Sequence, residues 1–156
     1  MADTFKIEIV ADNTEQVKQE MQSRVVKALT EVGINVATAA REEIQKSPSR
    51  IDTGLLRNSI THALNGESPA IGGYSADRAS KYTGKAPEPG TYSGTMPQGK
   101  QGVHTVYVGT NVEYAEYVHE GFHLPSGKEV APNRFLKNAV ENNKGEIISI
   151  IKQELT

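Results

Sequence analysis

Apolar residues recur at every third or fourth position over residues 17–44, and this pattern constrains the fold more than any other feature of the chain. The spacing is that of one face of an α-helix and predicts a single helix over residues 14–46. Gly33 and several β-branched residues weaken the intrinsic helix propensity of this stretch. The helix must therefore be stabilised by packing of its apolar face on a sheet or on a neighbouring subunit. That face comprises Val17, Met21, Val25, Ala28, Val32, Val36, Ala39 and Ile44.

A second apolar stripe predicts another long helix, over residues 132–155. Pro132 suits the first turn of a helix because its ring fixes φ at a helical value, and Gly145 allows a kink. The apolar stripe comprises Phe135, Leu136, Ala139, Val140, Ile147, Ile148, Ile151 and Leu155.

The remaining elements are short, and we expect them to build a small antiparallel sheet. Alternating apolar and polar residues predict strands at 4–10, 59–64, 70–74 and 104–110. A short helix is expected at 112–120, and a long glycine- and proline-rich loop at 75–103. The predicted fold is α+β: one domain of 156 residues, with the sheet packed against a long N-terminal and a long C-terminal helix.

Charge and composition exclude several functional classes. The net charge of -2, with both signs interspersed, disfavours sustained binding to nucleic acid or to an anionic membrane. The absence of cysteine excludes disulfides, cysteine zinc sites and thiol catalysis. No apolar run approaches the ~20 residues of a membrane span, and the N-terminus lacks the apolar segment of a signal peptide. We expect a soluble protein made in a cytoplasm.

Residues 119–123, His-Glu-Gly-Phe-His, match the H-E-x-x-H pattern of zinc hydrolases. In that pattern two histidines one helical turn apart bind zinc, and the glutamate is the general base for a metal-bound water. Gly121 opposes the continuous helix that this geometry requires, and a third ligand is missing. We therefore reject a metal site at His119, Glu120 and His123, and expect exposed histidines beside a helix C-terminus. A zinc-dependent hydrolase remains one alternative function.

Asp52-Thr53-Gly54 is also the signature of aspartic proteases, in which two such loops bring two carboxylates together. Those loops follow an apolar strand and continue with a small residue, whereas Leu55 and Leu56 follow Gly54 here. A turn is the simpler interpretation, with Asp52 or Thr53 bonded to backbone amides two or three residues on and Gly54 at the bend.

The long loop carries tyrosines interspersed with basic residues, a mixture that can contact single-stranded nucleic acid. Asp77 and Glu88 dilute its positive charge, so a protein-contact surface is the favoured interpretation. A single-stranded nucleic-acid-binding protein remains the second alternative function. The residues concerned are Tyr74, Arg78, Lys81, Tyr82, Lys85 and Tyr92.

Three motifs follow one another along the chain: Asp52–Ile60 (DTGLLRNSI), Val108–Val118 (VGTNVEYAEYV) with Gly121 after it, and Ala131–Leu136 (APNRFL). In this combination the chain resembles a family of neck proteins of tailed phages and prophages of the lambdoid siphophage type. Members are described as tail-completion, minor capsid or head-to-tail joining proteins. The resemblance extends over about residues 17–155.

The resemblance implies a structural virion protein without catalytic activity and without a cofactor. It implies a ring, expected to be a hexamer, between the head connector or stopper and the tail terminator or tail tube, assembled in the host cytoplasm. The family often has an aromatic residue, glycine and threonine after the tyrosine-containing helix, where this chain has residues 119–123 instead.

A physical argument supports the same kind of assembly. Two long apolar stripes and a small sheet leave apolar surface for a neighbour, and head-to-tail contacts that close make rings. Tyrosine and arginine are favoured at buried contacts. We expect Asp52, Arg57, Tyr114, Tyr117 and Phe135 at the subunit interface, with burial of the two tyrosines inside one subunit as the alternative. A mildly acidic ring would let DNA pass without tight binding.

Overall fold

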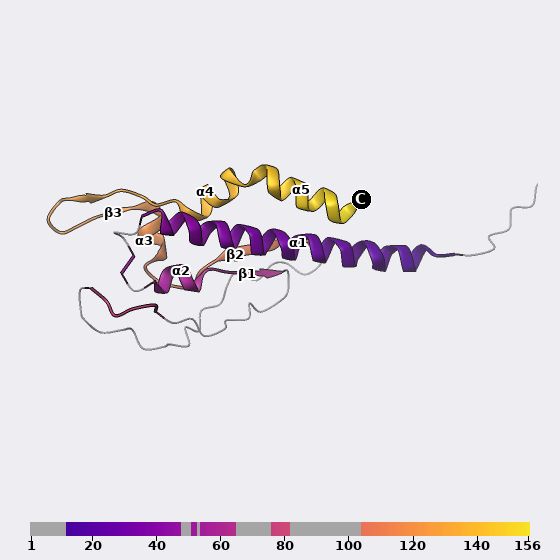
Figure 1. Cartoon of the computed structure of the whole chain (residues 1–156), viewed down its shortest axis with the longest axis horizontal. Helices are drawn as coiled ribbons and strands as arrows, with labels where there is room; N and C mark the ends of the chain where they lie inside the picture. The colour runs from indigo at the N-terminus through magenta and orange to yellow at the C-terminus, as the bar shows by residue number, and fades with distance from the viewer. Residues whose placement is uncertain (1–11, 48–50, 53, 65–75, 82–103) are drawn as a thin grey trace, which may run out of the picture.

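The computed structural model describes residues 12–47, 51–52, 54–64, 76–81 and 104–156, and one long helix organises them (Figure 1). In chain order the elements are α1 (Thr14–Gln45), α2 (Leu55–Ser59), β1 (Thr61–Leu64), β2 (Val106–Gly109), α3 (Ala115–Glu120), β3 (Phe122–His123), β4 (Glu129–Val130), α4 (Phe135–Asn142) and α5 (Lys144–Leu155). Helices and small antiparallel sheets thus occur together, which confirms the α+β class. The predicted strands 4–10 and 70–74 and most of the predicted loop 75–103 lie outside the described residues, and residues 76–81 of that loop contain no helix or strand.

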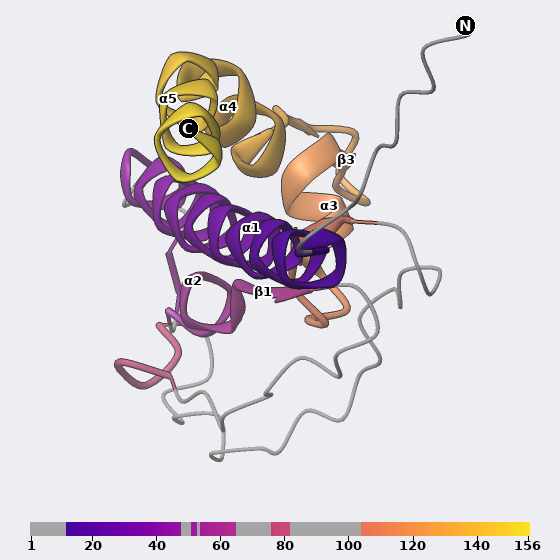
Figure 2. The same cartoon turned by 90° about the vertical axis from the view of Figure 1, so that its right-hand side faces the viewer.

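α1 lies between two layers, and both contact it. α4 and α5 cover one side of the helix, while α2 and the β1–β2 pair cover the other (Figure 2). The core forms where these layers meet the C-terminal half of α1, because that half carries small and β-branched apolar residues on more than one face. Its buried members are Val32, Val36, Ala37, Ala40, Ile44, Leu55, Leu56, Ile60, Val112, Ala115, Phe135 and Ala139.

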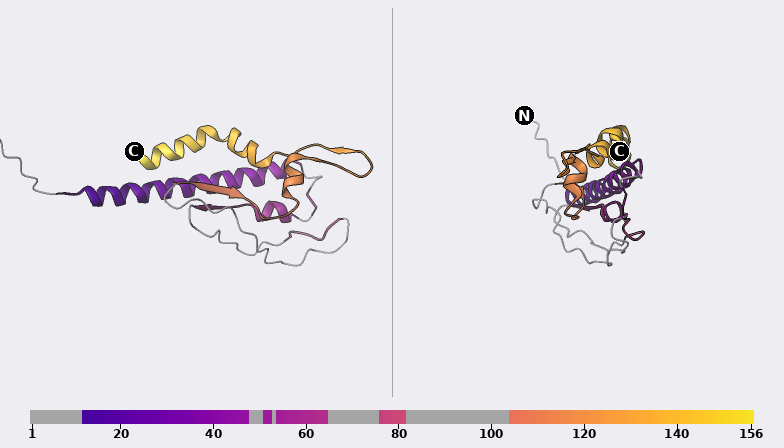
Figure 3. Two further views of the ribbon diagram at one scale, coloured as in Figure 1. Left: turned by 180° about the vertical axis from the view of Figure 1, so that it is seen from behind. Right: turned by 90° about the vertical axis from the view of Figure 1, so that its left-hand side faces the viewer.

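The N-terminal part of α1 projects beyond both layers (Figure 3). The last turn of α5 meets α1 at Lys27, whose Nζ lies 2.9 Å from a carboxylate oxygen of Glu154. Before that point the apolar face continues uncovered, with Val17 56% and Met21 47% exposed. The predicted apolar stripe of α1 is therefore buried only in its C-terminal part.

Gly33 has a packing role that its low helix propensity conceals. A Cβ atom at this position would lie 2.7 Å from a ring carbon of His62 on β1 and 2.8 Å from a methyl carbon of Val106 on β2. Such distances are well inside van der Waals contact, so any larger residue would push the strands away from α1. The glycine that weakens the helix lets the sheet approach it.

The predicted strand 59–64 begins with a helical turn instead. α2 occupies residues 55–59, and the strand starts only at Thr61. Burial explains the difference, because one helical turn places Leu55, Leu56 and Ser59 inside together. The Ser59 hydroxyl donates to the carbonyl oxygen of Leu56 at 2.8 Å, which satisfies it in this buried position. β1 then pairs antiparallel with β2, in a register that matches Thr61 with Gly109.

The predicted helix 132–155 is two helices. The break lies at Asn143, two residues before the glycine expected to allow a kink. The Asn143 side-chain amide donates to the carbonyl oxygen of Ala139 at 2.8 Å, and such local bonds compete with the helical ladder. α4 and α5 consequently form an arch over α1 (Figure 1).

The predicted strand 104–110 and short helix 112–120 are confirmed in shorter form, as β2 and α3. The β3–β4 hairpin was not predicted, because its strands have two residues each. Gly121 ends α3 as expected, at φ 80° and ψ 168°. No helix among the described residues is both long and apolar enough to span a membrane.

Candidate interaction surface

The two histidines of residues 119–123 do not lie on one helix. α3 ends at Glu120, and His123 lies on β3 beyond the glycine. The H-E-x-x-H geometry, which needs both imidazoles one turn apart on a continuous helix, is therefore not formed. Among the described residues no group of three or more histidines and carboxylates lies close enough to hold a metal ion.

His119 is largely buried, which corrects the expectation that both histidines are exposed. Its side chain is 19% exposed, and its ring meets the Phe135 ring edge to face with centroids 5.1 Å apart. Nδ1 lies 2.7 Å from a carboxylate oxygen of Glu120, while Nε2 is buried without a hydrogen-bond partner. His123 is exposed. The arrangement packs His119 against the core, beside a cavity of about 360 Å³ that Thr110 and Glu116 also line.

Asp52 holds a distant part of the chain. Its two carboxylate oxygens accept hydrogen bonds from the Ser80 hydroxyl at 2.6 Å and from the backbone amide of Lys81 at 2.7 Å. The Arg78 side chain donates to the carbonyl oxygen of Asp52 at 2.7 Å. The predicted turn at Gly54 is confirmed by its left-handed φ of 81°. Among the described residues, the Asp52 carboxylate binds residues 28 and 29 positions on; Thr53, the other residue expected to bond to a nearby amide, lies outside them.

Arg57 is engaged within the chain as well. Its guanidinium pairs with the carboxylate of Asp77, and the Asn58 side-chain amide donates to the other oxygen of that carboxylate at 2.8 Å. The sequence indicated a turn at Asp52–Arg57 but not its attachment to 76–81. A spacing of 19 to 29 residues carries no periodic signal that would reveal such pairs.

The two tyrosines and the phenylalanine expected at an interface have opposite surroundings. Tyr114 is 43% and Tyr117 62% exposed, which is contrary to the alternative that both belong to the core. Tyr117 touches only the edge of the Phe122 ring, with centroids 6.4 Å apart. Phe135 is 1% exposed and fills the centre of the chain's own core. In the described part of the chain, the exposed aromatic surface therefore consists of Tyr114 and Tyr117.

No protein-family model, curated protein or solved structure matches this chain. A function for the chain is therefore inferred from its sequence motifs and from the surfaces described above.

We expect acid to detach residues 76–81 from the loop that carries Asp52. The pKa of Asp52 is held below its ordinary value of 3.8, chiefly by the hydrogen bond from Ser80 and also by the Lys81 amide. A lowered pKa stabilises the attached state fully above 3.8 and loses that contribution as the pH falls through the folded-state value. The NMR resonance of the Lys81 amide should therefore move with a midpoint below 3.8.

Asp52→Asn is the control for this titration, because its amide side chain cannot be protonated in this range. The Lys81 resonance of that variant should not follow the same transition. A midpoint at or above 3.8 in the wild-type chain would contradict the assignment.

Proposed function

We propose that this chain is a structural subunit of the neck of a tailed phage, which assembles as a homo-oligomeric ring, expected to be a hexamer, at the junction of head and tail. The ring joins the connector or stopper to the tail-terminator or tail-tube proteins, in the virion. It acts by shape and adhesion and carries no catalytic group. The motifs at Asp52–Ile60, Val108–Val118 and Ala131–Leu136 support this family assignment.

The observation that carries the proposal is the amount of large apolar side chain left exposed on the described part of the chain. Apolar patches on a soluble protein commonly mark contacts with other proteins. The exposed residues lie along α1, just before and on α3, in the β3–β4 turn, and on α4 and α5. They are Val17, Met21, Val26, Ile34, Tyr114, Tyr117, Leu124, Val140, Ile148 and Leu155.

A conduit for DNA must not bind the phosphate backbone tightly. The net charge of -2 is compatible with this requirement, since tight binding needs clustered lysine and arginine side chains. In this proposal DNA passes through the ring without binding tightly to it.

Native mass spectrometry and electron microscopy of the purified chain test the proposal. We expect closed rings of identical copies, and weak binding to duplex DNA at physiological salt. A chain that remains monomeric at the highest attainable concentration would contradict the proposal, as would a tight, salt-dependent complex with duplex DNA. Stoichiometric zinc in the purified protein would support a zinc-dependent hydrolase. Tight binding of a single-stranded oligonucleotide would support a single-stranded nucleic-acid-binding protein.

The exposed tyrosines offer a matched pair of variants for the same measurement. Tyr114→Ser with Tyr117→Ser removes the aromatic surface of α3 and should shift the ring toward smaller species. Val140→Ser replaces an apolar residue of similar exposure, 44%, on α4. It should leave the ring intact if the contact depends on the tyrosines, and equal behaviour of the two variants would exclude that dependence.

A further inference from the structure

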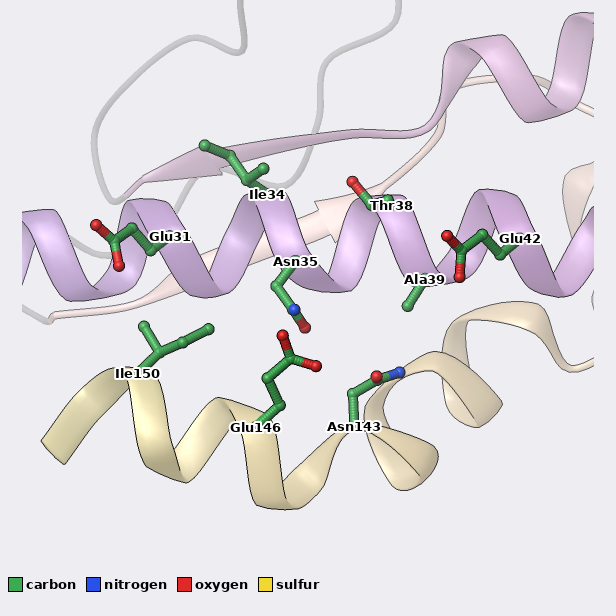
Figure 4. Close-up of a pocket in the computed structure, with 9 residues that line it drawn as sticks. All are labelled: Glu31, Ile34, Asn35, Thr38, Ala39, Glu42, Asn143, Glu146 and Ile150. Carbon is green, nitrogen blue, oxygen red and sulfur yellow. The ribbon is translucent and has the colours of Figure 1, made fainter. Parts of the chain in front are cut away.

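A groove opens under the arch of α4 and α5, on one side of α1 (Figure 4). It exists because the chain bends at Asn143 and thereby holds the start of α5 away from α1. The volume is about 480 Å³. α1 contributes Glu31 and Glu42 to its wall, α5 contributes Glu146, and Ile34 and Ile150 supply apolar surface.

The groove gathers hydrogen-bond acceptors and lacks cations. No lysine or arginine is among its lining residues. Glu31 lies 4.0 Å from the Nζ of Lys27, whereas Glu42 and Glu146 form no ion pair with any residue that the structure describes. Between them, the side-chain oxygen of Asn35 is buried and has no donor in the described part of the chain, and Asn35 and Glu146 point toward one another in Figure 4. Such a site is complemented by a side chain that brings several N–H donors and a positive charge.

The start of α1 carries that combination. Val17 and Met21 form an exposed apolar strip. Lys18 lies three residues before Met21 and Arg24 three residues after it, so the two cations flank the strip on its two sides. Among the residues that the structure describes, both cations pair with exposed carboxylates of their own helix, Lys18 with Glu15 at 3.9 Å and Arg24 with Glu20 at 2.8 Å. Exposed pairs of this kind contribute little and can be exchanged for others.

We propose that the N-terminal part of α1, residues 14–24 (the tip), docks into this groove on a second copy of the chain. This inference rests on the proposed ring and names the surfaces that close it. Lys18 and Arg24 meet the carboxylates on the two walls of the groove, and Val17 and Met21 cover Ile34 and Ile150. The tip and the groove are different surfaces of one chain, so the contact is head-to-tail and can continue around a ring. The face of α1 that α5 leaves uncovered is thereby buried by the neighbouring copy.

Charge exchange tests the contact. The tip variant, Lys18→Glu with Arg24→Glu, brings acidic side chains to an acidic groove. The groove variant, Glu42→Lys with Glu146→Lys, brings basic side chains to the two cations of the tip, Lys18 and Arg24. We expect each variant alone to need a protein concentration higher by roughly tenfold or more for assembly, the size typical when charge pairs at a contact become repulsions.

Assembly should return in two ways. An equimolar mixture of the two variants should form rings in which they alternate, because each acidic surface then meets a basic one. The chain that carries all four substitutions should form rings by itself. Lys128→Glu with Lys137→Glu changes the net charge by the same amount as the tip variant, on the β3–β4 turn and on α4, and should assemble like the wild type. Circular dichroism confirms that each variant is folded.

The outcomes separate this contact from the function that it serves. A ring that survives both the tip and the groove substitutions would overturn the contact and leave the neck proposal standing. Loss of assembly in both variants without recovery in the mixture or in the fourfold variant would also overturn it. A wild-type chain that never assembles would overturn the neck proposal itself.

Discussion

Phe135→Ala should lower the free energy of unfolding by about 3–5 kcal/mol, the range found when a buried aromatic side chain is truncated. Phe135 is 1% exposed and lies at the centre of the core. The substitution removes its contacts with α1 and with the His119 ring, and leaves a cavity that the surrounding helices can close only in part. Urea unfolding at a fixed protein concentration measures the loss, because the proposed assembly would make the apparent stability concentration-dependent.

Val140→Ala is the matched control on the same helix. Val140 is 44% exposed, so its truncation should change the free energy of unfolding by no more than about 0.5 kcal/mol. A loss below about 1 kcal/mol for Phe135→Ala would mean that Phe135 is not a core residue. It would then return to the set of candidate interface residues.

Gly121→Ala should cost about 2–5 kcal/mol, because two separate penalties apply. Its φ of 80° and ψ of 168° lie in a region that is open essentially to glycine alone, where other residues are strained by about 1–3 kcal/mol. An added Cβ would also lie 2.6 Å from the carbonyl oxygen of Val130 and 2.9 Å from the nitrogen of Pro132. Both are backbone atoms and cannot rotate away, so the connection from α3 to the hairpin must shift.

Gly127→Ala separates the two penalties. Gly127 has nearly the same φ, 79°, but nothing lies within 4 Å of the position of its Cβ. Gly127→Ala should lower the free energy of unfolding only by the cost of a left-handed backbone, about 1–2 kcal/mol. Hydrogen exchange adds a local measurement, because the Asn133 amide donates to the carbonyl oxygen of Val118 at 2.9 Å. That amide should lose protection in Gly121→Ala and keep it in Gly127→Ala; equal losses in both variants would show that the close approach does not matter.

Much of the local structure follows from signals that lie close together in the chain. The periodic stripe predicted α1 to within one residue at its end, and Gly121 was predicted to end the short helix. The break at Asn143 and the single turn of α2 were missed. The break at Asn143 depends on one side-chain hydrogen bond to the carbonyl oxygen of Ala139. α2 is too short to show a helical period in the sequence.

The candidate interface residues were likewise predicted only in part. Tyrosine at a helical spacing indicated a common face for Tyr114 and Tyr117, but that spacing is the same for a buried and an exposed face. Phe135 was also expected at the subunit interface, but it lies inside the core. The partners of Asp52 come from residues 80 and 81. Only the meeting of two distant segments reveals them.

Periodicity and glycine positions thus determined by themselves that this chain has two long amphipathic segments and short strands, because these properties depend on residues a few positions apart. The tertiary structure decided which part of each apolar stripe is covered. Burial depends on where remote segments end. α5 stops beside Lys27, so Val17 and Met21, on the same face as the buried Ala28 and Val32, remain exposed.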